Sequence, residues 1–558
     1  MKQDLIRLRL TQAVVTAGVM TTFLVNPWGN FDPISVVKML ALSSSAFLIL
    51  ALLFVGRNYL QLATEKYLLL AASFFIGWMM LAVLFSGAPL NQQVWGSFGR
   101  NTGFLTYASL TLVMLGAVYI RALGGYKKLI DLFLISSVPM TAYCLVQLSG
   151  NDPIGWSYSA AFGTLGNINF LSAYMGLVTV TALSYAIAFF NKKALISICL
   201  VFIILVDLYI VLMTGSIQGI VIFGAGAFVV IFLWLRSNKY SRILQPSFVF
   251  ISTITAIPTV MGILNSGPLA KYLFQNSTKL RGDYILAGWE MTLNHPFFGV
   301  GMDSYGDWYR ETRTQSAAEN GVDRVANTAH NIFLDISSNG GFPLLVAYFS
   351  LLVIAGLSAI KSYKLIGSRF DPVFAAILAA WLAYQIQALV SINQIGVGIW
   401  GWIFTGSLIG YSKGLAKNAD GVIQNSNAKR MKGQLLPPGA GLIAIFGAVF
   451  GFSLGAVPVK ADMDYIKSVR TGSLEQIVSN TRLLGSTPWH SEMALNYALN
   501  IPAPPQSLEI ARYLVSKYPR NSFGWQAIYF SDLATLEERQ IAIRILRKLD
   551  PYNPNWRQ

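Results

Sequence analysis

Long apolar runs alternate with short polar segments along most of the chain. A helix needs about 20 apolar residues to cross the hydrocarbon core of a bilayer, and thirteen runs reach or approach that length. Two of them are short, so the pattern predicts an all-α, polytopic helical membrane protein with about 12–13 transmembrane helices. The runs lie at residues 11–25, 34–55, 67–86, 103–120, 129–148, 168–190, 194–213, 217–235, 246–264, 342–360, 373–391, 397–411 and 439–457.

Two polar stretches interrupt this pattern, one before residue 342 and one after residue 458. They divide the chain into four expected parts. These are N-terminal transmembrane helices at 1–264, a large loop at 265–341, C-terminal transmembrane helices at 342–458, and a small soluble α-helical domain at 459–558.

The sequence of the last part predicts short amphipathic helices. Ser473 with Gln476 and Thr535 with Glu538 have the spacing of a capping box. The segments 518–521 and 550–553 share a similar sequence 32 residues apart, which resembles a degenerate tetratricopeptide pair with its usual period of about 34 residues. Such a domain either docks a protein partner or acceptor, or caps the membrane part. The sequence leaves both open.

Basic residues predict how the chain is oriented. Lys and Arg gather in the N-terminal tail and in alternate loops, whereas the intervening short loops hold only Arg100. Because basic loops stay in the cytoplasm, we expect a cytoplasmic N-terminus, with the large loop and the C-terminal domain on the outer face. This asymmetry also accounts for much of the net charge of +16, so the charge does not indicate nucleic-acid binding.

Composition excludes several other classes. Charged residues make up 12% of the chain, about half of the share in soluble proteins. The two cysteines, Cys144 and Cys199, both fall inside predicted spans, and the three histidines are far apart. We therefore expect no disulfide framework, no metal site and no cofactor.

The large loop ends in the segment 328–335, where a water-facing region re-enters the membrane. His330 lies in this segment, and a histidine is the side chain best suited to move protons near neutral pH. Asn331 and Asp335 follow within one helical turn or so, and we expect both among the groups that bind the substrate. The alternative is that His330 caps the next helix or bonds a loop carbonyl.

The same loop begins with an amphipathic helix in which Arg281, either Tyr284 or Ile285, and Gly288 share one face. The segment His295-Pro296 ends this helix, since proline cannot continue it, and Gly299 and Gly301 then allow a tight turn. We expect His295 to be structural. The planar fork of Arg281 suits phosphate oxygens, so it binds a lipid headgroup or a diphosphate, unless it pairs with a neighbouring carboxylate such as Asp283 or Glu290.

Three polar residues near the predicted outer ends of spans, and one within a span, are weaker candidates. Lys38 either contacts a diphosphate or snorkels outward, and we favour snorkelling. Asn167 and Asn169 suit sugar hydroxyls or cap a helix. Asp207, within a span, is a functional candidate because an intramembrane charge is costly. It is equally a protonated or locally bonded acid.

The order of these motifs resembles the O-antigen ligase and O-antigen polymerase superfamily. An arginine-bearing helix, His-Pro-x-x-Gly-x-Gly, a variable insert and Ala-His-Asn-x-x-Leu-Asp occur in that order over about residues 198–356. The C-terminal domain is similar to the extension carried by one subgroup. The resemblance implies a multi-pass protein of the bacterial inner membrane.

The resemblance also implies an activity. Such an enzyme transfers an oligosaccharide from an undecaprenyl-diphosphate carrier to an acceptor hydroxyl on the outer face, by an inverting reaction that uses no metal. His330 matches the family's base on the acceptor and Arg281 its diphosphate-binding arginine. A neutral imidazole accepts a hydroxyl proton at physiological pH. The acceptor stays open between a lipid A core, a protein hydroxyl and a second carrier-linked glycan.

Two departures from the family pattern narrow this prediction. A second arginine often found in the short outer turn is replaced by Ile217, beside the uncharged Gln218, and Asn339 stands where a glutamate is common. We expect Arg100 to supply the missing positive charge and Gln218 to add hydrogen bonds. Two other classes remain as alternatives: a transporter or flippase of lipid-linked oligosaccharides, and a non-catalytic glycan-assembly factor.

Overall fold

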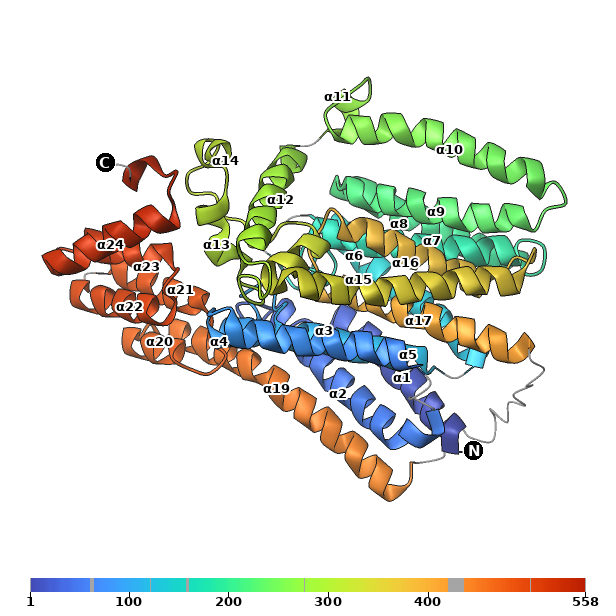
Figure 1. Ribbon diagram of the computed structural model, residues 1–558, viewed down its shortest axis with the longest axis horizontal. Coiled ribbons are helices and arrows are strands. Elements are labelled where there is room, and N and C mark those ends of the chain that lie inside the picture. Colours follow the sequence, from blue (N-terminus) through green and yellow to red (C-terminus); the bar gives the residue numbers. More distant parts are fainter. Residues whose placement is uncertain are drawn as a thin grey trace.

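The computed structural model describes residues 2–60, 65–120, 122–156, 160–274, 276–419, 436–501 and 503–556. Within these ranges every regular element is helical, which confirms the predicted fold class. Most of the long helices run side by side in one bundle (Figure 1), and each of the thirteen predicted apolar runs lies on a helix.

The bundle consists of α1 (Lys2–Phe23), α2 (Ser35–Leu60), α3 (Lys66–Phe85), α5 (Phe104–Val118), α6 (Ala122–Leu148), α7 (Ile168–Phe189), α8 (Ala194–Thr214), α9 (Ile217–Arg236), α10 (Ser241–Ile263), α15 (Ile332–Ile366), α16 (Pro372–Ala388), α17 (Ile395–Ala419) and α19 (Pro438–Thr471). Short helices join them at one end: α4 (Leu90–Trp95), α11 (Ala270–Leu273), α12 (Asn276–Asn294), α13 (Tyr305–Thr312) and α14 (Gln315–Glu319). The chain ends in α20 (Leu474–Thr481), α21 (Pro488–Asn500), α22 (Pro504–Lys517), α23 (Ser522–Phe530), α24 (Leu536–Leu549) and η2 (Pro554–Trp556).

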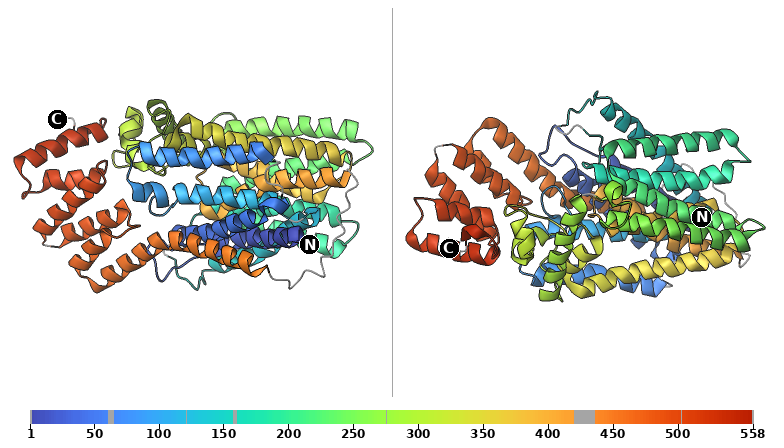
Figure 2. Two further views of the ribbon diagram at one scale, coloured as in Figure 1. Left: turned by 60° about the horizontal axis from the view of Figure 1, so that its bottom comes forward. Right: turned by 90° about the horizontal axis from the view of Figure 1, so that it is seen from above.

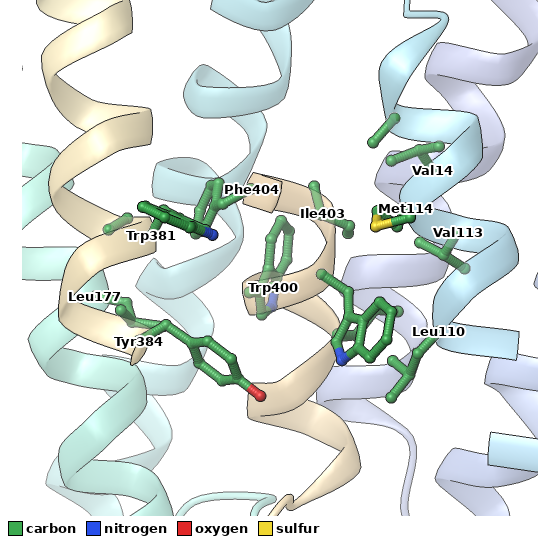
Figure 3. Packing of buried hydrophobic residues seen from close by; sticks show 14 of the residues in the cluster. Val14, Leu110, Val113, Met114, Leu177, Trp381, Tyr384, Trp400, Ile403 and Phe404 are labelled. Carbon is green, nitrogen blue, oxygen red and sulfur yellow. The ribbon is translucent and has the colours of Figure 1, made fainter. Parts of the chain in front are cut away.

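Nine helices in the described part of the chain are long and apolar enough to cross a membrane. Their buried faces share one core, in which Trp400 of α17 is fully buried between neighbouring helices (Figure 3). The shorter helices α5 and α16 are apolar and buried almost throughout. Because other helices surround them, they expose little surface to lipid.

A seam of small residues holds α19 against α2. Gly447, Gly451 and Gly455 recur every fourth residue, and a Cβ atom on each would lie within 2.5 Å of an α2 atom. The Ser43 hydroxyl donates a hydrogen bond to the Gly451 carbonyl across this seam. Small residues at such spacing let helix backbones approach closely in membranes. The seam therefore fixes the position of α19, and the C-terminal helices follow directly after α19.

The C-terminal helices α20–α24 lie at the end of the bundle away from the N-terminus (Figure 2). They have their own apolar core, which includes Tyr465 of α19, and α19 runs unbroken through the boundary expected at 458. The capping box of Thr535 and Glu538 is confirmed. At Ser473 only half of the box forms, because the Gln476 side chain accepts a bond from Thr471 instead.

A break in α15 explains why glycines occupy positions 299 and 301. The helix kinks at Gly341, whose φ is 77°, and the freed groups bond to the segment before α13. The amides of Val300 and Gly301 donate to the carbonyls of Ser338 and Asn339. A Cβ on Gly299 would lie 2.4 Å from the Asn339 backbone, so this close pairing requires glycine. The predicted tight turn is confirmed, with φ of 64° and 103° at the two glycines.

Candidate active site

His330 lies on a short segment that the surrounding structure holds in an unusual backbone conformation. Its φ is 52°, a left-handed value that costs a non-glycine residue of order 1–3 kcal/mol. Bonds on both sides fix it: the His330 amide donates to the Thr328 hydroxyl, and the Ala329 amide donates to Asp335. Asn331 caps α15 by accepting from the Leu334 amide. The cap expected as the alternative role of His330 is therefore made by Asn331.

The ring of His330 stacks on Tyr284 of α12, with 5.3 Å between the ring centroids. Burial lowers the pKa of His330 to about 4, helped by the positive charges of Arg100 and Arg281. No hydrogen bond of the imidazole to another described residue is found. At neutral pH this side chain is thus an uncharged imidazole with a free lone pair beside two cations.

Arg281 reaches the same place from the first turns of α12. Burial lowers its pKa, and its side chain makes no ion pair or hydrogen bond with the described residues. Of the expected carboxylate partners, Glu290 accepts a bond from Asn294 instead. Gly288, on the predicted face of the helix, allows Ala329 to approach, since a Cβ there would lie 3.2 Å from the Ala329 Cβ. Arg281 is therefore a half-buried cation available to an anion.

Arg100 reaches the site from a tight turn that folds around the carboxylate of Asp303. The Asp303 side chain accepts bonds from the amides of Ser97 and Thr102 and from the Thr102 hydroxyl. The Arg100 Nε atom lies 3.9 Å from Asp303 and has no hydrogen-bond partner among the described residues. Because Asp303 already accepts three bonds, much of the guanidinium remains open to another anion. The charges of Arg100 and Arg281 both lower the pKa of His330, so both cations lie near the imidazole.

Asp335 and Asn331 bond to the backbone on either side of His330. Asp335 is buried, with 4% of its surface exposed, and its bond to the Ala329 amide holds the backbone before the histidine. Asn331 is occupied by its cap. Both side chains, expected among the binding groups, make hydrogen bonds to backbone amides on either side of His330.

The N-terminal ends of α7 and α9 bring a second group of candidates together. Asn167 caps α7 by accepting from the Asn169 amide, and the Asn169 side chain accepts from the Ser216 hydroxyl. The Gln218 amide donates to the Val390 carbonyl at 3.4 Å, and its oxygen has no partner among the described residues. These residues line the turn that lacks the family arginine.

Lys38 does not snorkel outward, and that expectation is wrong. Its side chain is fully buried, and its ammonium group donates to the carbonyls of Thr21 and Thr22 at the end of α1. These carbonyls lie at the end of a helix and accept hydrogen bonds from the ammonium group inside the protein. The lysine therefore links α2 to α1. Asp207 of α8 accepts a hydrogen bond from the Thr141 hydroxyl of α6. The sequence did not identify this partner.

Several residues at the site were missed by sequence reasoning. Tyr284 supplies the ring under His330, and Asp303 organises the Arg100 turn. Asn393 and Gln394 line a cavity next to Arg100. The polar run Ser391-Ile-Asn-Gln394 between two apolar helices was the available signal for the last two. No sequence signal marked Asp303, because its hydrogen-bond partners lie some 200 residues earlier in the chain.

The comparison with protein families agrees with this arrangement. Residues 199–349 match the family model described as O-antigen ligase. This range contains Arg281 and His330 but not Arg100. No curated protein matches the chain. The match supports the O-antigen ligase superfamily and a membrane glycan-transfer function. Within the described ranges, no group of three or more His, Cys, Asp or Glu residues is placed to hold a metal ion.

Proposed function

We propose that this protein is a glycosyltransferase of the O-antigen ligase and polymerase type. It transfers a glycan from an undecaprenyl-diphosphate carrier to an acceptor hydroxyl at the outer face of the bacterial inner membrane. The observation that carries the proposal is the meeting of His330, Arg281 and Arg100, an unpaired neutral base beside two cations. The family match covers the first two of these residues.

The reaction follows from this arrangement. The acceptor oxygen attacks the anomeric carbon of the sugar while His330 takes the hydroxyl proton. The bond between that carbon and the diphosphate oxygen breaks on the opposite face, and its electron pair leaves with the diphosphate. Such a displacement inverts the anomeric centre. Arg281 and Arg100 stabilise the charge that builds on the leaving group, and one preorganised group of this kind is typically worth about 3–4 kcal/mol.

The distribution of polar elements supports the orientation of this site. Helices α12–α14 and α20–α24 lie at the end of the bundle opposite the N-terminus (Figure 1), and the basic tail and loops predict that the N-terminus is cytoplasmic. In this orientation the site opens to the outer face. There the diphosphate of a carrier lies at the membrane surface.

The lowered pKa of His330 makes a specific prediction for pH dependence. The imidazole loses its proton above a pH of about 4, so kcat/KM for the donor should stay flat from pH 8 to about 5.5. A bound diphosphate offsets the charges of both arginines and raises the histidine pKa. The acid limb of kcat should therefore lie at higher pH than that of kcat/KM. A limb of kcat/KM near 6.5, the ordinary histidine value, would contradict this assignment.

Complementation in cells tests the function. Deleting the gene should leave the glycan on its carrier, and the wild-type gene should restore transfer. Arg281→Ala should fail to restore it, whereas Lys279→Ala, an exposed cation two residues earlier on α12, should succeed. If Arg281→Ala abolishes transfer while Arg100→Ala leaves it intact, Arg100 is not the replacement cation. Full restoration by both arginine variants would refute the proposed site.

The same deletion separates the acceptors. A strain without a polymerase keeps single repeats attached to the final acceptor, whereas one without a ligase accumulates long chains on the carrier. Loss of a glycoprotein with intact lipopolysaccharide would instead indicate a protein acceptor.

A further inference from the structure

A polar cavity lies beside Arg100, between the N-terminal end of α2, the entrance to α7 and the segment between α16 and α17. Its volume is about 200 Å³. Arg100 and Gly99 form part of its wall, and Phe170, Asn393 and Gln394 form another part. The charge of Arg100 also acts on His330, so one guanidinium borders both the cavity and the transfer site.

Two buried amides on this wall have polar atoms without a hydrogen-bond partner among the described residues. Asn393 is 4% exposed, and neither its nitrogen nor its oxygen makes a hydrogen bond of normal geometry with a described residue. The Asn393 amide interacts with the Tyr107 hydroxyl, but this contact falls short of normal hydrogen-bond geometry. The Gln394 side chain is 8% exposed. Its oxygen accepts from the Val397 amide at the start of α17, but its nitrogen has no partner among the described residues.

These unmade bonds cost free energy, which a ligand would recover. A buried polar group without a partner costs about 1–3 kcal/mol, so proteins rarely keep several at one place without a function. Asp32, the acidic group of the wall, is already used, because it accepts bonds from the amides of Ile34, Ser35 and Val36. The free groups of the cavity are therefore amide donors, one amide acceptor and a guanidinium.

This chemistry fits a sugar ring better than a second phosphate. Amides both donate to and accept from hydroxyl groups, and Phe170 offers an apolar face to the ring carbons. A phosphate would use the donors and leave the Asn393 oxygen unpaired. We infer that this cavity is a subsite for the first sugar of the carrier-linked glycan, held by Asn393 and Gln394 while Arg100 binds the adjoining diphosphate. The inference rests on the proposed function.

The variant Asn393→Leu distinguishes a binding role from a structural one. Leucine has nearly the same shape as asparagine, and here it removes a buried amide that makes no hydrogen bond of normal geometry and only a weak contact with the Tyr107 hydroxyl. The thermal stability of the protein should therefore stay the same or rise, whereas a structural amide would lower it when replaced. The matched control is Ser407→Ala. It removes a buried hydroxyl on α17 that also has no hydrogen-bond partner among the described residues, and it should leave transfer and carrier binding unchanged.

The binding experiment uses the full-length protein in lipid nanodiscs. The probes are undecaprenyl diphosphate alone and the same carrier bearing glucose, galactose, N-acetylglucosamine or N-acetylgalactosamine. The wild-type protein should bind at least one sugar-bearing carrier about tenfold more tightly than the bare carrier, the equivalent of about 1.4 kcal/mol. In Asn393→Leu this preference should fall below about threefold, with the affinity for the bare carrier kept within about twofold.

Two outcomes overturn the inference in different ways. Equal binding of all five carriers by the wild-type protein, or an unchanged preference in Asn393→Leu, would mean that the cavity holds only ordered water, while the diphosphate site would stand. Failure of the wild-type protein to bind any carrier would refute the proposed function and the subsite together.

Discussion

Replacing His330 with alanine should lower the rate of glycan transfer by about 10²–10⁴-fold, the usual contribution of a positioned general base. The loss should appear in kcat, because no other described side chain at the site is an unpaired neutral base. Arg281 and Arg100 remain in this variant, so the affinity for the carrier should be kept or improved. The measurement is initial-rate kinetics together with a direct binding assay for the carrier.

His295→Gln is the matched control for this prediction. His295 directly follows α12 and contacts the ring of Trp308 in α13, with 4.5 Å between the ring centroids. It lies outside the cluster formed by His330 and the two arginines. Its variant should transfer glycan at a rate close to that of the wild-type protein. Comparable losses in both variants would mean that the histidines act through the fold of the loop, not through a proton transfer.

Replacing Asp550 with alanine should release the C-terminal helices from the loop that carries the site. Asp550 is 1% exposed and accepts bonds from Arg310 and from the fully buried guanidinium of Arg313. Removing one partner of a buried ion pair costs about 3–5 kcal/mol, because the other charge is left uncompensated. Thermal unfolding of the purified protein should shift to lower temperature.

The effect of this change should spread to the loop before His330. Arg313 also donates to the carbonyls of Gly321, Val322 and Arg324, and hydrogen exchange in residues 313–327 should therefore rise. Glu509→Ala, which breaks the exposed pair of Arg482 and Glu509, is the control and should change neither property. Unchanged exchange in Asp550→Ala would show that the loop holds its structure without the C-terminal helices.

The two similar motifs of the C-terminal domain make this contact. In the first, Arg520 lies over the Trp308 ring at 3.4 Å and pairs with Glu311. In the second, Asp550 binds Arg310 of α13 and Arg313, which directly follows this helix. A third contact, between the stacked rings of Phe98 and Trp489, 3.8 Å apart, holds the turn of Arg100. We propose that the domain caps and orders the site, whatever partner its outer surface binds.

Features that depend on local sequence were predictable. The apolar runs gave every long helix, Pro296 marked the end of α12, and Gly299 and Gly301 marked a turn. The shared face of Arg281 and Gly288 followed from helical spacing, which left the residue between them open between Tyr284 and Ile285. Each of these features is determined by residues within a few turns of one another.

Features that depend on distant contacts were not predictable in the same way. Lys38 was expected to point outward, because the sequence does not show that the carbonyls of Thr21 and Thr22 lie above it. The Asp303 carboxylate and the amide of Asn393 looked like ordinary loop residues. The Asp303 carboxylate bonds to the turn of Arg100, and Asn393 lines the same cavity as Arg100, only in the folded chain. A side chain in a loop carries no periodic pattern that would reveal such contacts.

The central claim is that the chain itself transfers the glycan and that His330 takes the acceptor proton. The most direct test uses purified protein in nanodiscs with the carrier-linked glycan, a second carrier-linked glycan or lipid A core as acceptor, and a chelator of divalent metals. The wild-type protein should release one undecaprenyl diphosphate for each glycan transferred, and folded His330→Ala should release almost none. Full activity of His330→Ala, or no release by the wild-type protein with either acceptor, would contradict the account.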